Sequence, residues 1–299
     1  MSDSPSSSRN PFSRRTSFSS QSILLYKVTT TLSYLLLLIT AIYYNFRAPH
    51  DGDTKHHHNL HNARFWEHNF STPFAQSAII TSIYWIVVFI LQLGYVAAFY
   101  SSNETYVTAA ANLASHFISS NLVLFGFVHL WVRSHFVLSL LLLLVNFANL
   151  STAYFRHSTT PRFIHIGVLT GPLAWTFVGL YWAGSVAVFQ SHANAAIARI
   201  VANVFIWGWV GYAGIFLVGF KDYTIGYALS VLALATGVGQ FLTKPHLLQL
   251  QWVFAFTIGG LLFVVATAVG LPGLLGRDPF PRGQIVSEDR ERAPLLADD

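Results

Sequence analysis

Residues 135–155 read HFVLSLLLLLVNFANLSTAYF and contain no Asp, Glu, Lys or Arg. A run of about 20 apolar residues is long enough for an α-helix to cross the hydrocarbon core of a bilayer. Other stretches of the chain have the same length and character. The sequence therefore predicts an all-α fold, a polytopic membrane helix bundle with about eight transmembrane helices. These helices are expected over residues 24–45, 76–99, 109–131, 135–155, 164–189, 199–219, 223–242 and 250–271.

The composition of the chain agrees with a membrane protein. Charged residues make up 10% of the 299 residues, hydrophobic residues make up 53%, and the mean hydropathy is +0.49. Helices of this length can bury one another, so a single transmembrane bundle is expected over residues 23–272, between tails at 1–22 and 273–299. The chain has no cysteine, which excludes disulfides, thiolate metal sites and cysteine nucleophiles.

The acidic residues avoid the predicted helices. All 12 Asp and Glu residues fall outside the expected spans. Proton pumps and ion-coupled transporters use ionisable groups within the hydrocarbon, because these groups carry the charge or bind the ion. The spans offer imidazole, carboxamide and hydroxyl groups instead, which disfavours those classes of transporter.

The distribution of Lys and Arg predicts the orientation of the chain. With an even number of spans both termini lie on one side of the membrane, and that side would carry 11 of the 17 basic residues. Because cytoplasmic loops are enriched in Lys and Arg, both termini are expected in the cytosol and loop 46–74 in the lumen. The basic pI, near 9.5, then reflects charge beside the bilayer, and no nucleic-acid partner is expected.

The first 22 residues are rich in Ser and Arg and lack apolar periodicity, so a disordered cytosolic tail is expected. Arg14, Arg15, Thr16 and Ser17 have the form of a site for a basophilic kinase. A phosphate on Ser17 would reduce the positive charge beside the membrane. We therefore predict phosphorylation at Ser17, with an unmodified basic tail as the alternative.

Residues 273–299 are expected to form a second disordered cytosolic tail. Glu291, followed by Leu295 and Leu296, matches the acidic dileucine signal that clathrin adaptors read. Such an extended peptide offers one carboxylate to a basic site and two Leu side chains to an apolar pocket. A clathrin adaptor is therefore a predicted partner besides the lipid bilayer. A vacuolar or endosomal membrane is favoured over the endoplasmic reticulum or the plasma membrane.

Loop 46–74 contains six of the 13 His residues of the chain. Neutral imidazole beside carboxylate suits Zn²⁺, Cu²⁺ or Ni²⁺. His56, His58 and His61 are therefore candidate ligands for a divalent metal, and a flexible polar loop with adventitious affinity is the alternative. Asn69 begins an N-glycosylation sequon on the expected lumenal side.

The third predicted span, 109–131, is the least apolar. Asn112, His116 and either Ser119 or Ser120 follow helical spacing and share one face, and Asn121 follows them. Such groups point into a bundle, where they form either hydrogen bonds between helices or a polar pocket. A His-dependent intramembrane enzyme is a further alternative, although a Ser-His-Asp triad would lack an intramembrane acid. Haem ligation lacks partner histidines at matching depth, so no cofactor is predicted.

Aromatic residues make up 15% of the chain, including eight Trp. In the fifth predicted span Trp175, Tyr181 and Trp182 lie close to Gly171 and Gly179. Small residues beside large rings let helices approach closely or leave a flat apolar slot. Ordinary aromatic packing is the alternative.

Two resemblances follow from these segments. The stretches VRSHFVLSLLLLLVNFANLSTAYFRH, KDYTIGYALSVLALATGVGQFL and QWVFAFTIGG resemble an uncharacterised fungal family of multi-span membrane proteins. More distantly, the first span, the long loop, FAQSAIITSIYWIVVFILQLGYV, NLASHFISSNLVLFGFVHLW and the Trp175–Trp182 stretch are similar in order to the tryptophan-rich sensory protein family, TspO. Spans six to eight exceed the five-helix pattern of that family, and its Pro- and Trp-dense loop is His-rich here.

The resemblance to TspO implies an aromatic-lined pocket for a flat apolar ligand such as a porphyrin or a sterol. The residues it implies for ligand binding are Trp85, Asn112, His116, Asn121, Trp175, Tyr181 and Trp182. The predicted function is therefore to bind or move a small apolar molecule, without enzymatic activity. An intramembrane His-dependent enzyme and the handling of a divalent metal by loop 46–74 are the two alternatives.

Overall fold

A computed structural model describes residues 11–49, 63–68, 72–157, 160–190, 195–242 and 250–274. This part of the chain has no strand, and eight of its helices are long and apolar enough to cross a membrane. They cover Ser20–Phe46, Ala78–Ala98, Glu104–Trp131, Phe136–Arg156, Arg162–Val188, Ala196–Gly219, Tyr223–Leu242 and Gln251–Pro272. The predicted all-α bundle and its eight spans are confirmed, with small differences at the helix ends. The eight apolar helices are compatible with an integral membrane protein.

The spans are built from α-helices and shorter helical segments. The fifth span joins two α-helices through a π-helix, and the sixth consists of two short α-helices and a π-helix. In chain order the elements are α1 (Ser20–Phe46), the 3-10 turn η1 (Phe65–His68), α2 (Ala78–Ala98), α3 (Glu104–Trp131), α4 (Phe136–Arg156), α5 (Arg162–Ile164), the π-helix η2 (His165–Thr170), α6 (Gly171–Gln190), α7 (Ala195–Phe205), α8 (Gly208–Gly214), the π-helix η3 (Ile215–Gly219), α9 (Tyr223–Leu242) and α10 (Gln251–Leu274).

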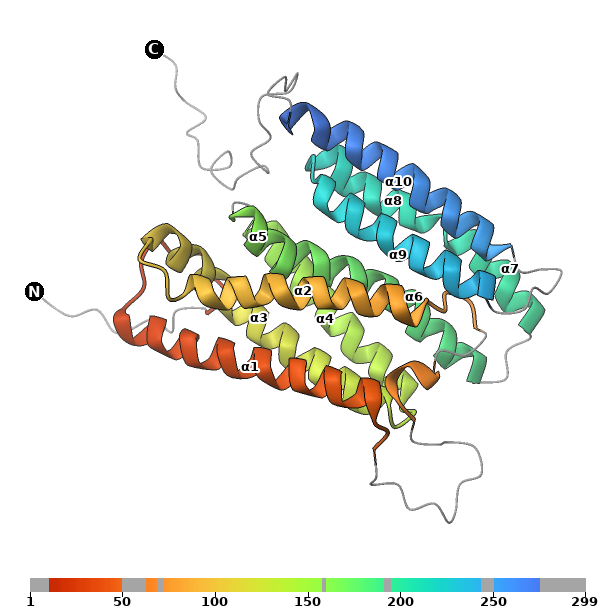
Figure 1. Cartoon of the computed structure of the whole chain (residues 1–299), viewed down its shortest axis with the longest axis horizontal. Coiled ribbons are helices and arrows are strands. Elements are labelled where there is room, and N and C mark those ends of the chain that lie inside the picture. The colour runs from red at the N-terminus through yellow and green to blue at the C-terminus, as the bar shows by residue number, and fades with distance from the viewer. Residues whose placement is uncertain are drawn as a thin grey trace, which may run out of the picture.

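The helices run back and forth along one common direction (Figure 1). The first residue of α1 and the last residue of α10 lie at the same end of the bundle, on the left in Figure 1. We call this end the terminal face. The opposite end, where α1 stops and η1 lies, is called the loop face.

The fifth span forms the centre of the bundle. Its most apolar window is 83% buried, compared with 28–61% for the other spans. α2, α4 and α9 pack around it, whereas α1 packs mainly on α3, and α10 packs mainly on α9. A helix that is buried on all sides needs apolar or small residues all round. α6 meets this requirement, because its sequence GPLAWTFVGLYWAGSVAVFQ contains no charged residue.

Two glycines allow close backbone contacts inside the bundle. A Cβ on Gly167 of η2 would lie 2.8 Å from a side-chain atom of α2, and one on Gly239 of α9 would lie 2.6 Å from the carbonyl oxygen of Ala75. Neither position has room for a side chain. The segment before α2 therefore lies directly on α9, where the Ser77 N–H donates to the carbonyl of Ala235 at 2.8 Å.

Residues 11–18, which we call the N-terminal arm, precede α1 and lie against α3. The sequence predicts disorder over residues 1–22, whereas α1 begins at Ser20. Ser19 caps the helix, because its Oγ accepts a hydrogen bond from the Ser22 N–H at 3.2 Å. The Ser115 hydroxyl of α3 donates to the carbonyl of Pro11 at 2.9 Å. The arm is thus attached to the bundle by hydrogen bonds that the sequence did not indicate.

Candidate functional site

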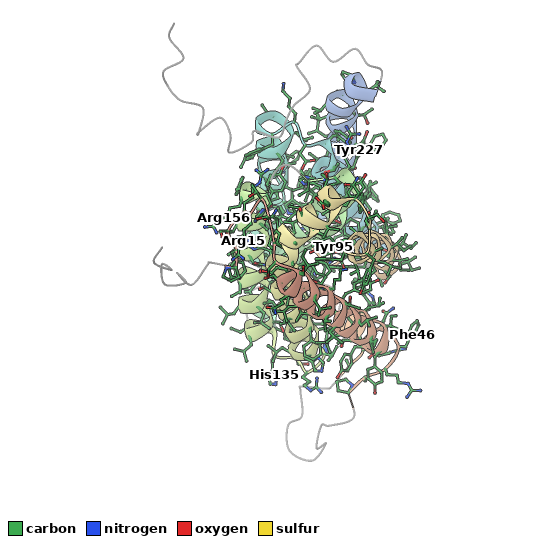
Figure 2. All side chains as sticks on the ribbon, turned by 90° about the vertical axis from the view of Figure 1, so that its left-hand side faces the viewer. Arg15, Phe46, Tyr95, His135, Arg156 and Tyr227 are labelled. Atoms are coloured by element: carbon green, nitrogen blue, oxygen red, sulfur yellow. The ribbon has the colours of Figure 1, made fainter. Side chains whose placement is uncertain are left out.

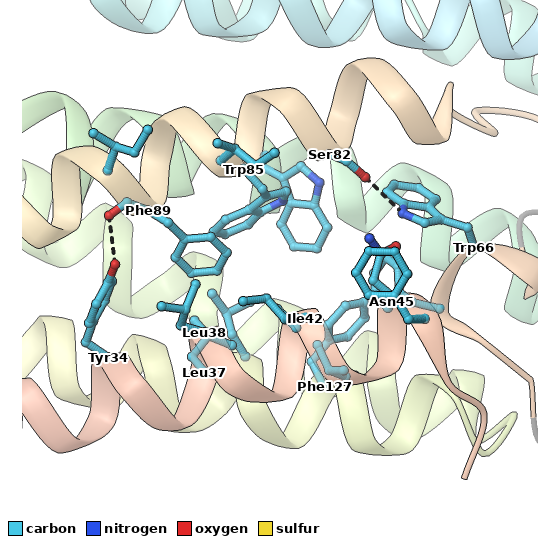
Figure 3. A pocket seen from close by; sticks show the side chains of 18 of the residues that line it. Tyr34, Leu37, Leu38, Ile42, Asn45, Trp66, Ser82, Trp85, Phe89 and Phe127 are labelled. Carbon is cyan, nitrogen blue, oxygen red and sulfur yellow. Dashed lines mark hydrogen bonds between the residues drawn. The ribbon is translucent and has the colours of Figure 1, made fainter.

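A cavity of about 570 Å³ lies between α1, α2, α3 and α6, and η1 contributes to its wall at the loop face. Apolar and aromatic side chains form most of this wall (Figure 3). The lining residues are Tyr34, Leu37, Leu38, Ala41, Ile42, Asn45, Phe46, Phe65, Trp66, Ser82, Trp85, Ile86, Phe89, Ile90, Leu93, Leu124, Phe127, Val128 and Trp175. Ligand pockets typically measure about 300–1,000 Å³, so the cavity has the size of a small-molecule site.

Indole and phenyl rings shape the inner wall of the cavity. The ring centroid of Trp175 lies 5.0 Å from that of Trp85 and 5.8 Å from that of Phe127, with steeply inclined planes in both pairs. Trp85 also packs on Phe89, with 5.4 Å between the ring centroids. Edge-to-face pairs at such distances are favourable. Rings from α2, α3 and α6 therefore support one another and hold the wall in place.

The cavity is partly open, and we infer that its opening lies between α1 and α2, because the exposed lining residues belong to these two helices. Residues on both rims are exposed: Ile42 of α1 is 53% exposed, and Ile90 of α2 is 63% exposed. In a bilayer these apolar rims face the acyl chains of the lipid. A molecule dissolved in the bilayer would therefore reach the cavity from the side.

Polar groups lie at two positions along the cavity. The Tyr34 hydroxyl donates to the carbonyl of Phe89 at 3.0 Å, near the middle of the bundle. Towards the loop face, Trp66 Nε1–H donates to Ser82 Oγ at 3.2 Å. The Asn45 side chain lies beside Trp66 at this end (Figure 3). The loop-face end of the cavity is thus its more polar end.

Trp175 carries a hydrogen-bond donor that has no partner. The residue is 2% exposed and lines the cavity, and its Nε1 is unpaired among the described residues. Buried polar groups are nearly always paired with protein, water or ligand, and leaving one unpaired costs about 1–3 kcal/mol. Trp182 and Trp209 also have an unpaired Nε1, but neither lines the cavity. Because its Nε1 atom is itself buried, this donor lies behind the surface of the wall, and other atoms of the Trp175 ring line the cavity.

Two of the aromatic residues that the TspO resemblance implies, Trp85 and Trp175, line the cavity. Trp182 lies behind the wall, with its ring centroid 5.8 Å from that of Trp66. Tyr181 packs in a separate aromatic group of the bundle. The four predicted aromatic residues therefore do not form one site.

Asn112 and Asn121 of α3 do not line the cavity, and each bonds to another element. Asn112 Oδ1 accepts from the backbone N–H of Arg15 at 2.7 Å, and its amide donates to the Arg15 carbonyl at 3.0 Å. Asn121 donates to Ser33 Oγ of α1 at 3.3 Å. Asn112 therefore holds the N-terminal arm, and Asn121 joins two helices.

His116, the third polar residue predicted on α3, lies next to His157, which follows α4. Their ring centroids are 5.6 Å apart, and each residue is 3% exposed. His116 Nδ1 lies 2.8 Å from the amide oxygen of Asn149, so its partner is a carboxamide and not a serine. Burial, and then the charges of His116, Arg14 and Arg156, lower the pKa of His157 to about 4. His157 is therefore neutral at physiological pH.

A buried carboxylate, Asp222, lies in the loop between the sixth and seventh spans and is 5% exposed. Its Oδ2 lies 2.8 Å from His165 Nε2 and accepts from the Tyr154 hydroxyl at 2.9 Å, while Oδ1 accepts from the Thr224 N–H at 2.9 Å. Burial acts to raise the pKa of Asp222, but the hydrogen bonds from His165, Thr224 and Tyr154 hold it below its ordinary value. Glu104 is the first residue of the third span, and Asp222 lies outside the spans but reaches the interior of the bundle. Its loop position in the sequence gave no sign of burial.

Some cavity residues were not indicated by the sequence. Tyr34 and Asn45 of α1, Ser82 of α2 and Phe127 of α3 all line the cavity. The aromatic content of these spans was visible, but which faces of α1 and α2 turn towards each other depends on how the helices pack.

Several predicted sites lie outside the described residues. These are the metal candidates His56, His58 and His61, the sequon residue Asn69, and the sorting-signal residues Glu291, Leu295 and Leu296. Ser17 lies within the described residues and is exposed in the N-terminal arm. Over the part of the chain that the structure describes, no group of three or more His, Cys, Asp or Glu side chains could hold a metal ion.

Comparison with known proteins relates part of the chain to fungal proteins without an assigned function. Residues 199–296 match the family described as "Fungal protein of unknown function (DUF1774)". An uncharacterised protein of Schizosaccharomyces pombe is 34% identical over 107 residues, which cover 36% of this chain and 36% of that protein. The match therefore spans about a third of the length of this relative. No solved structure matches the chain. The resemblance to an uncharacterised fungal family is confirmed, and these matches do not bear on the resemblance to TspO.

Proposed function

We propose that this chain, whose residues 199–296 match fungal proteins of unknown function, binds a small and mostly apolar molecule in the cavity between α1, α2, α3 and α6. The cavity itself, with about 570 Å³ of space enclosed by apolar and aromatic side chains, is the observation that carries the proposal. The apolar wall supplies affinity by burying the surface of the ligand.

The wall favours a flat, uncharged molecule of the sterol type over a porphyrin. Among the described lining residues none is Lys, Arg or His. A porphyrin with carboxylate side chains would bring charges that these residues cannot pair, and burying an unpaired charge is expensive. A sterol brings a single hydroxyl, or a ketone oxygen in its oxidised form, and Asn45 and Ser82 supply polar groups for it at the loop-face end of the cavity. The sideways opening between α1 and α2 suits a molecule that enters from the bilayer.

The test is equilibrium binding of a tritiated sterol to the purified protein in mild detergent. Trp85→Ala removes an aromatic ring from the cavity wall, and we expect it to weaken binding by about tenfold, which corresponds to about 1.4 kcal/mol. Trp207→Ala is the matched control, because Trp207 is 42% exposed and lies outside the cavity. This control variant should bind as the unchanged protein does.

Two results would contradict the proposal. One is the absence of saturable sterol binding together with the absence of any apolar adduct in native mass spectra of the protein purified from its own membrane. The other is an equal loss of sterol affinity in Trp85→Ala and Trp207→Ala, since that would reflect general damage to the fold.

For the cellular location, we infer a vacuolar or endosomal membrane with both termini in the cytosol. The inference rests on the basic-residue distribution and on the dileucine pattern of Glu291, Leu295 and Leu296, which an adaptor can read only in the cytosol. Replacing both leucines by Ala in a fluorescently tagged protein should move it to the plasma membrane. Residues Asn103, Glu104 and Thr105 form a second N-glycosylation sequon, which this orientation places in the cytosol. An unchanged distribution, or a glycan on Asn103, would contradict the inference.

A further inference from the structure

A second group of residues, separate from the cavity, lies where α3, the end of α4 and the N-terminal arm meet. His116 of α3 and His157 after α4 are each 3% exposed, and their ring centroids lie 5.6 Å apart with planes inclined by 67°. Phe12 of the arm covers them, with its ring centroid 4.9 Å from that of His116. The two imidazoles are thus enclosed together.

The hydrogen bonds of this pair fix which ring nitrogen carries the proton. The amide of Asn149 donates to the backbone carbonyl of His116 at 2.9 Å, so its oxygen is the atom that faces His116 Nδ1, at 2.8 Å. His116 Nδ1 is therefore the donor and carries the proton. His157 is hydrogen bonded to the backbone of Phe12, and because its Nε2 has no partner, the bond comes from Nδ1.

Each ring consequently presents an Nε2 lone pair that nothing in the described structure uses. Both Nε2 atoms are buried and have no hydrogen-bond partner among the described residues. A buried acceptor without a partner is costly, and two of them side by side require an explanation. Histidines that bind a metal show the same arrangement, because they donate the other ring nitrogen to a carbonyl or carboxylate, which fixes the tautomer and the ring orientation.

We propose that His116 and His157 bind one soft monovalent cation of the Cu⁺ type between their Nε2 atoms, beneath the N-terminal arm. Imidazole is a good ligand for copper, and Cu⁺ accepts two ligands without completing its shell with water. In a linear two-coordinate complex with metal–nitrogen bonds of about 2.0 Å, the two ring centres lie about 6 Å apart. The ring centres of His116 and His157 are 5.6 Å apart, so a shift of a few tenths of an ångström brings them to this spacing.

The surroundings favour a monovalent ion over a divalent one. Zn²⁺ normally takes four ligands, whereas the described part of the chain contains no group of three or more His, Cys, Asp or Glu suited to a metal. Arg14 and Arg156 act electrostatically on His157, and their repulsion is smaller for a single positive charge. In Figure 2, a view onto the terminal face, Arg15 of the arm and Arg156 lie in the same region of this face.

The N-terminal arm provides the cover of the site. Asn112 holds the backbone of Arg15 through two hydrogen bonds, and Ser115 holds the carbonyl of Pro11. These contacts place Phe12 over the imidazoles. An ion would therefore enter or leave when the arm lifts from α3.

The experiment is a competition for Cu⁺ between a chromogenic chelator and the full-length protein under anaerobic, reducing conditions. Loop 46–74 also contains histidines, so the background protein carries Asn in place of His56, His57, His58 and His61. We expect this background to bind one equivalent of Cu⁺. His116→Gln and His157→Gln should each weaken binding at least tenfold.

His129→Gln is the matched control, because His129 lies on the same helix and its Nε2 already has a partner, the Tyr44 hydroxyl at 3.5 Å. It should leave Cu⁺ affinity unchanged. X-ray absorption spectroscopy of the Cu⁺-loaded background protein, in which His116 and His157 are unchanged, does not depend on how the variants fold. It should show two nitrogen ligands at about 2 Å from the copper. No bound equivalent in the background protein, or equal affinity in all three Gln variants, would overturn the proposal.

Discussion

His165 Nε2 and Asp222 Oδ2 lie 2.8 Å apart, and the two side chains are only 4% and 3% exposed. His165 begins η2 in the central span, whereas Asp222 lies in the loop between η3 and α9. The Tyr154 hydroxyl of α4 donates to the same carboxylate oxygen at 2.9 Å. One carboxylate thus joins three parts of the bundle at the terminal face. Its removal leaves several buried donors without a partner.

Asp222→Ala should destabilise the protein strongly. Without the carboxylate, His165, the Tyr154 hydroxyl and the Thr224 N–H each lose a hydrogen-bond partner, and a buried donor without a partner costs about 1–3 kcal/mol. Thermal unfolding in detergent, followed by loss of the monodisperse species, measures the effect as a lower Tm. Glu67→Ala is the control, because Glu67 pairs with Arg64 on the surface, where such pairs contribute about 0–1 kcal/mol. Equal Tm values for the two variants would show that the cluster around Asp222 contributes little.

The contribution of Asp222 should depend on pH. Its pKa in the folded protein is lower than its ordinary value, so folding favours the ionised carboxylate. The stabilisation is complete above the pKa of the unfolded chain, about 3.9, and is lost as the pH falls through the lower folded pKa. The Tm difference between the unchanged protein and Asp222→Asn should therefore be constant near neutral pH and shrink in acid below about pH 4. A difference that stays constant down to pH 3 would contradict the assignment.

Gly239→Ala should destabilise the bundle, because the new Cβ would lie 2.6 Å from the carbonyl oxygen of Ala75. The Cβ is fixed to the main chain of α9, and the oxygen belongs to the main chain of the segment before α2, so neither atom can move away easily. We expect the free energy of unfolding to fall by about 1–3 kcal/mol. Gly211→Ala is the control, since nothing lies within 4 Å of a Cβ at that position of α8. There the substitution should be neutral or stabilise by up to about 1 kcal/mol, the difference in helix propensity. The Tm of each variant in detergent tests this, and equal Tm shifts would contradict the close contact.

Ala41→Phe should fill part of the cavity and reduce sterol binding. Ala41 lines the cavity from α1, and a benzyl group there would occupy space that the ligand needs. We expect the number of bound sterol molecules or their affinity to fall at least tenfold, with the Tm unchanged or raised. Leu32→Phe on the same helix is the control, because Leu32 is 61% exposed and lies outside the cavity. Sterol binding that survives Ala41→Phe would place the ligand elsewhere.

Asn112→Ala should make Ser17 a better substrate for a basophilic protein kinase. Asn112 bonds both the N–H and the carbonyl of Arg15, whose backbone a kinase must bind in extended form. Loss of these two hydrogen bonds releases the N-terminal arm from α3, so the initial rate of phosphate incorporation at Ser17 in vitro should rise several-fold. Asn121→Ala, which removes a hydrogen bond to Ser33 instead, should leave the rate unchanged. A rate that does not respond to Asn112→Ala would show that the arm is accessible without release.

The fold class and the number of spans could be predicted from the amino-acid sequence alone. Stretches such as 135–155 carry no charge over the thickness of a bilayer, and in that environment a helix satisfies its own backbone hydrogen bonds. The resemblance to TspO implied Trp85 and Trp175 as candidate pocket residues, and the small residues beside Trp175 also favoured an apolar slot there. Both residues line the cavity.

Which of the polar and aromatic residues meet depends on how the helices pack. Asn112, Asn121 and His116 lie on α3 but bond to the N-terminal arm, to α1 and to α4, because α3 contacts all three of these elements. Asp222 is buried although it belongs to a loop, since its oxygens reach donors that lie 57 and 68 residues away in the chain. Contacts over such separations depend on the rotation of each helix about its axis and on the angles at which the helices cross. A membrane helix is apolar on most of its faces, so its hydrophobic pattern does not specify the rotation or the crossing angles.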